Sequence, residues 1–408
     1  MKMRSRARMV VLSVLAASLC ASGMADARTT IKFWTCFSGD YGKVLERICA
    51  RFEKENPDIR VLYSCPASNG DVYVAKILAA VAGGAGPDMV WTVPEWMVSL
   101  YDRMVVPLPT LQKLGGGLET SRFYRGLVEP RNHYKGTLYG IPFENSNMAL
   151  FYNKSLFAAA GLPEAPKTWD ELTQYALKLT RKETKQFGID TFFPNWFMPM
   201  FYAQKGVQII DGNKINFDAK AGIEAVTWFT DLQTKHKVNG TGFLNGKAAM
   251  SLLGGWDYPG LVKAKKVNFG IAPLPIPEGG MPSSLITFKE LAILKNGDMK
   301  KVAAAWQLAR YILSDDVFVE WCMATGYLPV TRSQAAVPAY KRYLDNNPGL
   351  EVMVDQTETG CMMPVVRGSL NIWAALQQAL DAIGLGKKSV GQALAEANKA
   401  AQAFAKAK

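Results

Sequence analysis

The sequence has very few of the residues on which most hydrolases and metalloproteins depend. It contains two histidines, His133 and His236, which lie far apart with no acid or nucleophile pattern around them. Histidine is the usual general base and a common metal ligand, so its scarcity argues against both classes. There is also no CxxC motif and no Cys/His cluster with metal-ligand spacing. We therefore expect neither a metal nor another cofactor.

Apolar runs are short, and the one with a clear meaning is at the start of the chain. It extends from Met9 to about Cys20, and Ala25-Asp26-Ala27 follows it. The basic residues that precede it are Lys2, Arg4, Arg6 and Arg8. A basic head, an apolar run and a small-x-small site in this order predict a cleaved secretory signal over residues 1–27. The alternative is a membrane anchor, but the run is short for roughly 30 Å of hydrocarbon.

The rest of the chain is expected to be soluble and exported to the periplasm. Leu19 stands before Cys20, where a lipoprotein signal would have a small residue, so lipid attachment is not expected. An exported compartment permits disulfides. The cysteines that remain after residue 27 are Cys36, Cys49, Cys65, Cys322 and Cys361. One or two bridges are expected, an odd cysteine must remain, and spacing leaves the pairing open.

The charge is positive but has no pattern typical of nucleic-acid binding. The formal net charge is +12, and removing the signal, which carries +3, leaves +9. Such a charge could attract anions or nucleic acid. However, lysines and arginines are scattered at helix-surface spacing, and no basic run alternates with aromatic residues. A solvated surface is the better interpretation, and no nucleic-acid partner is expected.

Length and periodicity predict two α/β domains. Removing 27 of the 408 residues leaves 381, which is too long for one ordinary core. Strand and helix patterns alternate in the first part of the chain. The predicted strands are 30–34, 59–63 and 88–91, and the predicted helices are 44–55 and 72–82. This order predicts a mostly parallel sheet with helices on both faces.

A second series of elements follows. It comprises strands at 149–153, 187–190 and 267–271, a short helix at 156–160, and a helix from Thr168 to about Thr184. Thr168 and Glu171 form a capping-box pattern at the start of that helix. The proline-rich residues 273–277 suit an extended crossover between domains. The last 40 residues are alanine-rich and predicted to be helical.

Several segments, taken in order, resemble one family. They are FWTCFSGDYGKVLERICARFEKENPDI, GAGPDMVW, LYGIPFENSNMALFYNKSLFAAAGL with KTWDEL behind it, LNGKAAMSLLGGW, VNFGIAPLP, ATGYLPVTRS and NIWAALQQALDAIGLGKKSVGQALAEANKAAQAF. In this order they resemble the extracellular solute-binding proteins of carbohydrate ABC importers, a group that includes maltose-binding and glycerol-3-phosphate-binding proteins. The resemblance covers nearly the whole chain after residue 27.

The resemblance implies the two-lobe α/β fold of type II periplasmic binding proteins, with several chain crossings as a hinge. The expected N-terminal lobe is 28–143 plus about 284–332, and the C-terminal lobe is 144–283 plus about 333–408. The resemblance also implies a monomer that closes around a small ligand in the cleft and docks onto the transmembrane subunits of an ABC permease.

Aromatic side chains that cover the apolar faces of a sugar are the first candidates for the ligand site. Trp256 follows an apolar strand and two glycines, and Gly255 lets the backbone approach a ligand closely. Relatives often have a stacking tryptophan here, although a core tryptophan is the alternative. Trp373 matches a second aromatic family position. Asn195 and Trp196 fall in a loop that lines the cleft in relatives.

Polar candidates fall on loops at the ends of strands, where α/β clefts form. They are Asp40, Tyr41, Asp71, Glu95, Asn145 and Ser146. Relatives often place a hydroxyl-binding acid at the position of Glu95, but an acid that interacts with the helix macrodipole is an equal alternative. Asn145 and Ser146 fall at the first expected hinge crossing.

Arg367 and Tyr327 match the glycerol-phosphate branch of the family. An arginine in the cleft would pair with phosphate or carboxylate, whereas an exposed arginine would only add charge. Trp256 argues the other way, because that branch would have a small polar residue there. We therefore expect a sugar or polyol as ligand, with sn-glycerol-3-phosphate or a glycerophosphodiester as the alternative.

Two other functions remain open. An exported glycosidase would need a pair of carboxylates, for which Asp40, Asp71 and Glu95 are available, but no acid lies in a recognised hydrolase motif. A binding protein that docks on a sensor instead of a permease is the third hypothesis. We expect a binding protein and no enzymatic activity.

Overall fold

The computed structural model describes residues 28–68, 70–98, 100–128, 134–191, 195–364, 366 and 368–406. The predicted signal over residues 1–27 lies outside these ranges. Within them, none of the helices combines the length and the apolar character that crossing a membrane requires.

A mixed sheet runs through the molecule, in the order β2-β1-β3-β10-β4-β8-β5, with β11 beside β10 and β9 beside β4. Its strands are β1 (Thr29–Trp34), β2 (Ile59–Ser64), β3 (Met89–Thr92), β4 (Ile141–Asn153), β5 (Phe187–Asp190), β8 (Ala248–Gly254), β9 (Phe269–Ala272), β10 (Leu285–Ile293) and β11 (Cys361–Met362). A separate hairpin pairs β6 (Ile210–Asp211) with β7 (Lys214–Ile215).

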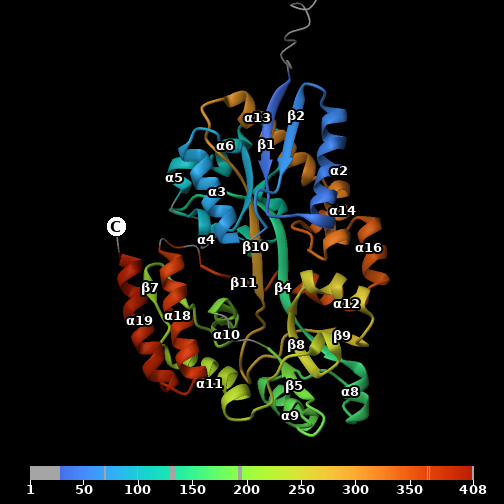
Figure 1. Cartoon of the computed structure of the whole chain (residues 1–408), viewed down its shortest axis with the longest axis vertical. Helices are drawn as coiled ribbons and strands as arrows, with labels where there is room; N and C mark the ends of the chain where they lie inside the picture. The colour runs from blue at the N-terminus through green and yellow to red at the C-terminus, as the bar shows by residue number, and fades with distance from the viewer. Residues whose placement is uncertain are drawn as a thin grey trace, which may run out of the picture.

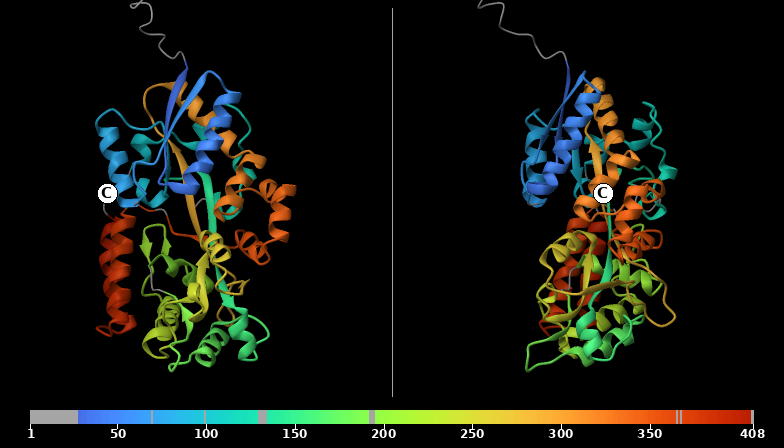
Figure 2. Two further views of the ribbon diagram at one scale, coloured as in Figure 1. Left: turned by 45° about the vertical axis from the view of Figure 1, so that its right-hand side comes forward. Right: turned by 90° about the vertical axis from the view of Figure 1, so that its right-hand side faces the viewer.

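The predicted parallel arrangement is confirmed for the first three strands and wrong for the centre of the sheet. β1 pairs in parallel with both β2 and β3. In contrast, β10 pairs antiparallel with β3 and β4, and β4 pairs antiparallel with β8 and β9. β4 and β10 lie along the long axis and connect the upper and lower halves of the molecule (Figure 1). The further views in Figure 2 show the same connection.

Helices cover both halves of this sheet. They are α2 (Gly39–Glu55), α3 (Gly70–Ala82), α4 (Pro94–Met97), α5 (Tyr101–Met104), α6 (Leu108–Gln112), α7 (Arg125–Val128), α8 (Lys154–Ala159), α9 (Trp169–Leu179), α10 (Met198–Gln204), α11 (Lys220–Thr234), α12 (Tyr258–Ala264), α13 (Met299–Ile312), α14 (Asp315–Thr325), α15 (Arg332–Ala335), α16 (Pro338–Asp345), α17 (Leu350–Gln356), α18 (Ser369–Gly384) and α19 (Val390–Lys406).

Local signals explain several helix ends. α2 buries an apolar stripe and ends at Glu55, with Asn56 as its C-cap directly before a proline, as its sequence predicts. The capping box of Thr168 and Glu171 is present at the start of α9. However, α9 ends at Leu179 and not near Thr184, because the chain turns back there and Arg181 pairs with Gln186.

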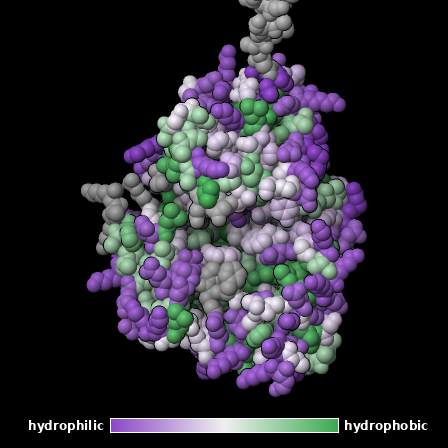
Figure 3. Space-filling view, in the orientation of Figure 1, coloured by the Kyte–Doolittle hydropathy of each residue, from purple (hydrophilic) through white to green (hydrophobic). Residues whose placement is uncertain are grey.

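The buried side chains form two main cores. The first joins residues between 31 and 143 to residues between 286 and 340, together with Met362. The second joins residues between 148 and 285 to residues between 361 and 401, which include α18 and α19. Hydrophilic residues cover much of the outer rim of both halves, and less polar residues gather toward the middle (Figure 3). The lobe boundaries expected from the sequence stay a prediction, and the first core reaches Tyr340, beyond residue 332.

Two further expectations are corrected by the structure. The proline-rich residues 273–277 do not form the crossing, because the backbone of Ile276 is hydrogen-bonded to Lys167 and Trp169 beside α9. The chain crosses between the halves in β4 and again in β10. The expected disulfides are also absent among the described residues, where none is formed by Cys36, Cys49, Cys65, Cys322 or Cys361.

Candidate functional site

A cleft of about 880 Å³ opens where the two cores meet. One wall comes from the first core and includes Val93, Trp96 and Tyr327. The opposite wall comes from the second core and includes Trp196 and Trp373. Strand β10 contributes residues between the walls. Five of the residues expected from the sequence line this cleft, namely Asn195, Trp196, Trp256, Tyr327 and Trp373.

Trp256 lies at the junction of the two cores, because its ring packs against both of them. It belongs to the short 3-10 helix η5 (Gly255–Asp257), directly after β8. A Cβ atom at Gly254 would lie 2.4 Å from the Trp256 ring, so glycine is needed for this close approach. The ammonium of Lys289 lies 5.7 Å from the centre of the ring. The ring is only half-buried and is available to a flat ligand.

Asn195 connects two of the cleft tryptophans, Trp196 and Trp373. It lies in η3 (Asn195–Phe197), where its side-chain amide donates to the carbonyl oxygen of Trp373 at 2.7 Å. Its backbone N–H donates to Oε1 of Gln377 at 2.9 Å. These bonds hold Trp196 against the start of α18. The indole N–H of Trp373 is buried and has no hydrogen-bond partner among the described residues.

Tyr327 follows α14 and lines the cleft from the first core. Its ring stacks on Trp321, with centroids 6.2 Å apart and an interplanar angle of 4°. The neighbouring Leu328 forms a backbone bridge with Asn145 of β4. This packing fixes the tyrosine at the base of the cleft, beside the strand that crosses between the halves.

Asn145 and Ser146 are at the crossing, as expected, but they do not line the cleft. Both are fully buried in β4. The Asn145 amide donates to the carbonyl oxygen of Pro329 at 2.8 Å and to Oγ1 of Thr357 at 3.1 Å. The Ser146 hydroxyl accepts from the backbone N–H of Gly255 at 3.0 Å. The Asn145 amide N–H groups and the Ser146 hydroxyl therefore bond other parts of the hinge and not a ligand.

Gly255, Asp40 and Tyr41 also lie outside the lining of the cleft. Gly255 is buried under the loop after α14, where a Cβ atom would lie 2.5 Å from the carbonyl oxygen of Gly326. Asp40 is exposed at the start of α2, 3.6 Å from the ammonium of Lys43. The Tyr41 hydroxyl donates to a carbonyl oxygen at the end of α14, and its ring packs on other aromatic residues.

Three candidates cannot be placed by their side chains. Arg367 lies outside the described residues, as do the side chains of Asp71 and Glu95. The backbone of Glu95 belongs to α4, between Val93 and Trp96, both of which line the cleft. The roles expected of these three residues stay predictions.

Sequence reasoning missed several residues of the cleft. They are Val93, Trp96, Leu285, Ile286, Thr287, Lys289, Met362, Met363, Leu370, Ala374, Gln377 and Gln378. Trp96 could have been found, since it is an aromatic residue one position beyond the candidate Glu95. Lys289 could not, because only the pairing of β10 with β4 shows where its side chain lies.

Glu144 lies beneath the cleft and has an unusual environment. It is fully buried in β4 and is the cross-strand partner of Lys289. Burial raises the pKa of its carboxyl to about 8, although the positive charge of Lys289 acts in the opposite direction. Near Trp256, burial also raises the pKa of Asp257, and the backbone N–H of Gly254 opposes this effect.

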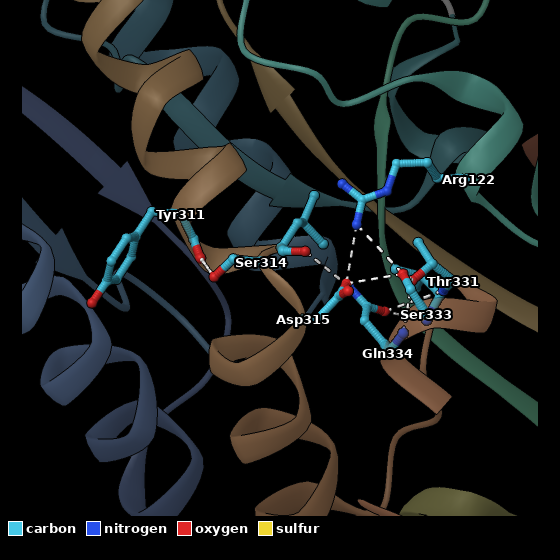
Figure 4. A network of polar contacts seen from close by, with 9 residues as sticks. Arg122, Tyr311, Ser314, Asp315, Thr331, Ser333 and Gln334 are labelled. Carbon is cyan, nitrogen blue, oxygen red and sulfur yellow. Dashed lines mark hydrogen bonds and ion pairs between the residues drawn. The ribbon is translucent and has the colours of Figure 1, made fainter. Parts of the chain in front are cut away.

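A second pocket, of about 530 Å³, lies away from this cleft, between the end of α2 and the start of α14. Two of its charged groups are paired with each other (Figure 4): Asp315 accepts from the Arg122 guanidinium at 3.1 Å, and also from the Ser333 hydroxyl at 3.0 Å. The Tyr311 hydroxyl donates to Glu55. These bonds connect α14 to the segments around it. The described residues also contain no group of His, Cys, Asp and Glu side chains that could hold a metal ion.

Comparison with known proteins identifies the family. Residues 47–348 match the model of the family described as bacterial extracellular solute-binding protein. The chain belongs to this family. The solute-binding protein is 25% identical, over 413 residues, to the sn-glycerol-3-phosphate-binding periplasmic protein UgpB of Salmonella typhimurium, and 93% of each chain is covered. Its identity to UgpB of Escherichia coli K12 is also 25%, over 94% of each chain.

Solved structures confirm the type II periplasmic-binding-protein fold that the resemblance implied. The cyclic alpha-maltosyl-1,6-maltose binding protein of Arthrobacter globiformis has a TM-score of 0.81 and 22% identity, and covers 93% of this chain and 99% of its own. UgpB of Mycobacterium tuberculosis, solved with glycerophosphocholine, has a TM-score of 0.81 and 20% identity, with 92% and 98% covered.

Proposed function

We propose that this solute-binding protein captures a sugar in the cleft between the two cores and delivers it to the membrane subunits of an ABC importer. The observation that carries the proposal is the position of Trp256, whose half-buried ring lies at the junction of both cores, in a cleft also lined by Trp196 and Trp373. Flat aromatic rings cover the apolar C–H faces of a sugar.

In this proposal the protein works outside the cytoplasmic membrane as a monomer, and it binds its ligand without converting it to a product. A ligand that touches both walls stabilises the closed form by its differential affinity for that form. Delivery then requires docking of the closed form on a permease. Incubation with candidate glycosides tests the absence of turnover, because release of a hydrolysis product would show an enzyme instead.

Replacement of Trp256 tests the site. Trp256→Ala is expected to weaken sugar binding at least about tenfold, as for loss of a buried aromatic anchor. Isothermal calorimetry measures the affinity of the sugar selected by a thermal-shift screen of mono- and oligosaccharides, since a ligand that binds the native state raises its stability. Trp228→Phe is the matched control, because Trp228 stacks on Trp169 away from the cleft. Equal affinity in Trp256→Ala and the control would remove Trp256 from the site.

A second candidate ligand is sn-glycerol-3-phosphate or a glycerophosphodiester. It is favoured by Lys289, whose ammonium lies in the cleft over Trp256, and by the UgpB relatives. Lys289→Met would then abolish binding of the phosphorylated ligand and spare neutral sugars. If neutral sugars bind wild type and phosphorylated compounds do not, this candidate is rejected.

A further inference from the structure

Glu144 is the buried group whose presence the proposed function leaves unexplained. It lies on β4, which crosses between the two halves, and it is fully buried. Neither carboxyl oxygen has a hydrogen-bond partner among the described residues. A buried polar group without a partner destabilises the folded state, and a charged one does so more strongly. A carboxyl at this position therefore needs an explanation other than stability.

The neighbours of Glu144 connect it to the cleft. Lys289 is opposite it across the strand pair, where Cβ atoms are about 5 Å apart. The Tyr327 hydroxyl and the Trp91 indole N–H approach the carboxyl closely enough to lower its pKa, without forming a well-aligned hydrogen bond. Lys289 and Tyr327 both line the cleft. Glu144 thus lies directly behind two cleft residues and does not line the cleft itself.

The other titratable groups that face Glu144 stay neutral near pH 7. They are Cys36 after β1, Tyr41 of α2, Cys322 of α14 and Tyr327 itself. Burial raises the pKa of each of them, and the charge of Glu144 raises it further. Among these described neighbours, Lys289 therefore brings the positive charge that responds to Glu144.

We infer that Glu144 is a positioning residue that couples ligand binding to a proton: the protonated carboxyl leaves Tyr327 and Lys289 at the surface of the cleft, and its ionisation draws both toward the carboxylate and weakens binding. The inference rests on the proposed function for its ligand. The physical reason is that a buried carboxylate needs donors, and Tyr327 and Lys289 are the cleft-lining residues that act on this carboxyl. Because burial raises the pKa of Glu144 to about 8, the change falls between about pH 7 and 9.

The first test uses the protein without ligand. Acetylation of Lys289 by an N-hydroxysuccinimide ester is followed by mass spectrometry, relative to the exposed Lys295, at pH 6.5 and 9.5. An ionised carboxylate stabilises the ammonium, so at pH 9.5 Lys289 should react about tenfold faster in Glu144→Gln than in wild type, in line with a pKa change of about one unit from an adjacent charge. At pH 6.5 the two rates should agree.

The control is Asp257→Asn, which removes another carboxyl of raised pKa near Trp256 and should behave as wild type does. If Glu144→Gln does not fold, wild type alone decides the test. Its ratio of the Lys289 acetylation rate to the Lys295 acetylation rate should fall by about tenfold from pH 6.5 to 9.5, with an inflection near pH 8. A ratio that is constant from pH 6.5 to 9.5 in wild type overturns the inference.

The second test measures affinity, with maltose and glycerophosphocholine as probes, by calorimetry at pH 6.5 and 9. A probe that binds wild type should lose at least about fivefold in affinity at the higher pH and should lose nothing in Glu144→Gln. Equal pH dependence in the two proteins overturns the inference. If neither probe binds at pH 6.5, maltose and glycerophosphocholine are rejected as ligands of the proposed function, and the acetylation result still decides whether the ionisation of Glu144 affects Lys289.

Discussion

Replacement of Glu144 by glutamine should change how the stability of this protein depends on pH. Burial raises the pKa of the carboxyl from 4.5 to about 8 in the folded state. Between these two values the unfolded chain has released a proton that the folded chain keeps. Unfolding therefore releases a proton, and the contribution of this group to stability falls as the pH rises.

The magnitude follows from the same pKa values. At 1.36 kcal/mol per pH unit, a carboxyl whose pKa is 4.5 unfolded and about 8 folded destabilises the fold by roughly 5 kcal/mol above pH 8, relative to pH 4. Glutamine does not ionise, so Glu144→Gln lacks this slope. Its buried amide adds a pH-independent cost of about 1–3 kcal/mol, because its N–H groups need new partners.

Urea unfolding followed by tryptophan fluorescence at pH 5, 6.5 and 8 measures the effect. The free energy of unfolding of Glu144→Gln minus that of wild type should increase by about 4 kcal/mol from pH 5 to pH 8. Other titrating groups contribute equally to both proteins and cancel in the difference. A difference that stays constant over this range would refute the reasoning, because Glu144 would then ionise in the folded state as it does in the unfolded chain.

Three other outcomes are expected. Gly255→Ala should lower the melting temperature by several degrees, in line with about 1–3 kcal/mol of steric strain, because the new Cβ meets a backbone oxygen at 2.5 Å. The control Gly260→Ala, in α12, should not lower it, because open space surrounds that position. Lys289→Met should leave the melting temperature within a few degrees of wild type, since the side chain is half-exposed. A reductant should not change the melting temperature, because the described cysteines, among them Cys36 and Cys65, form no disulfide. A decrease would reveal a disulfide.

The candidate site could be predicted only in part. Trp256 and Trp196 were found because an aromatic residue on a loop after a strand is a typical sugar-binding pattern, and Trp373 because it matches an aromatic position of the family. All three line the cleft. Asn145 and Ser146 were placed at the hinge, but the pattern could not show that their polar groups are used by the backbone and by Thr357. A polar residue at the end of a strand does not by itself reveal which group its side chain will be hydrogen-bonded to.

The sequence by itself determined the local elements and the family. The alternation in β1, the apolar stripe of α2 and the capping box of Thr168 depend on residues a few positions apart, so they can be read along the chain. The ordered segments that resemble solute-binding proteins carried the two-lobe fold. Tertiary structure decided the rest. The antiparallel pairing of β4 with β10 joins residues about 145 positions apart, and this pairing places Lys289 in the cleft and Glu144 behind it. Glu144 is buried there without a hydrogen-bond partner among the described residues.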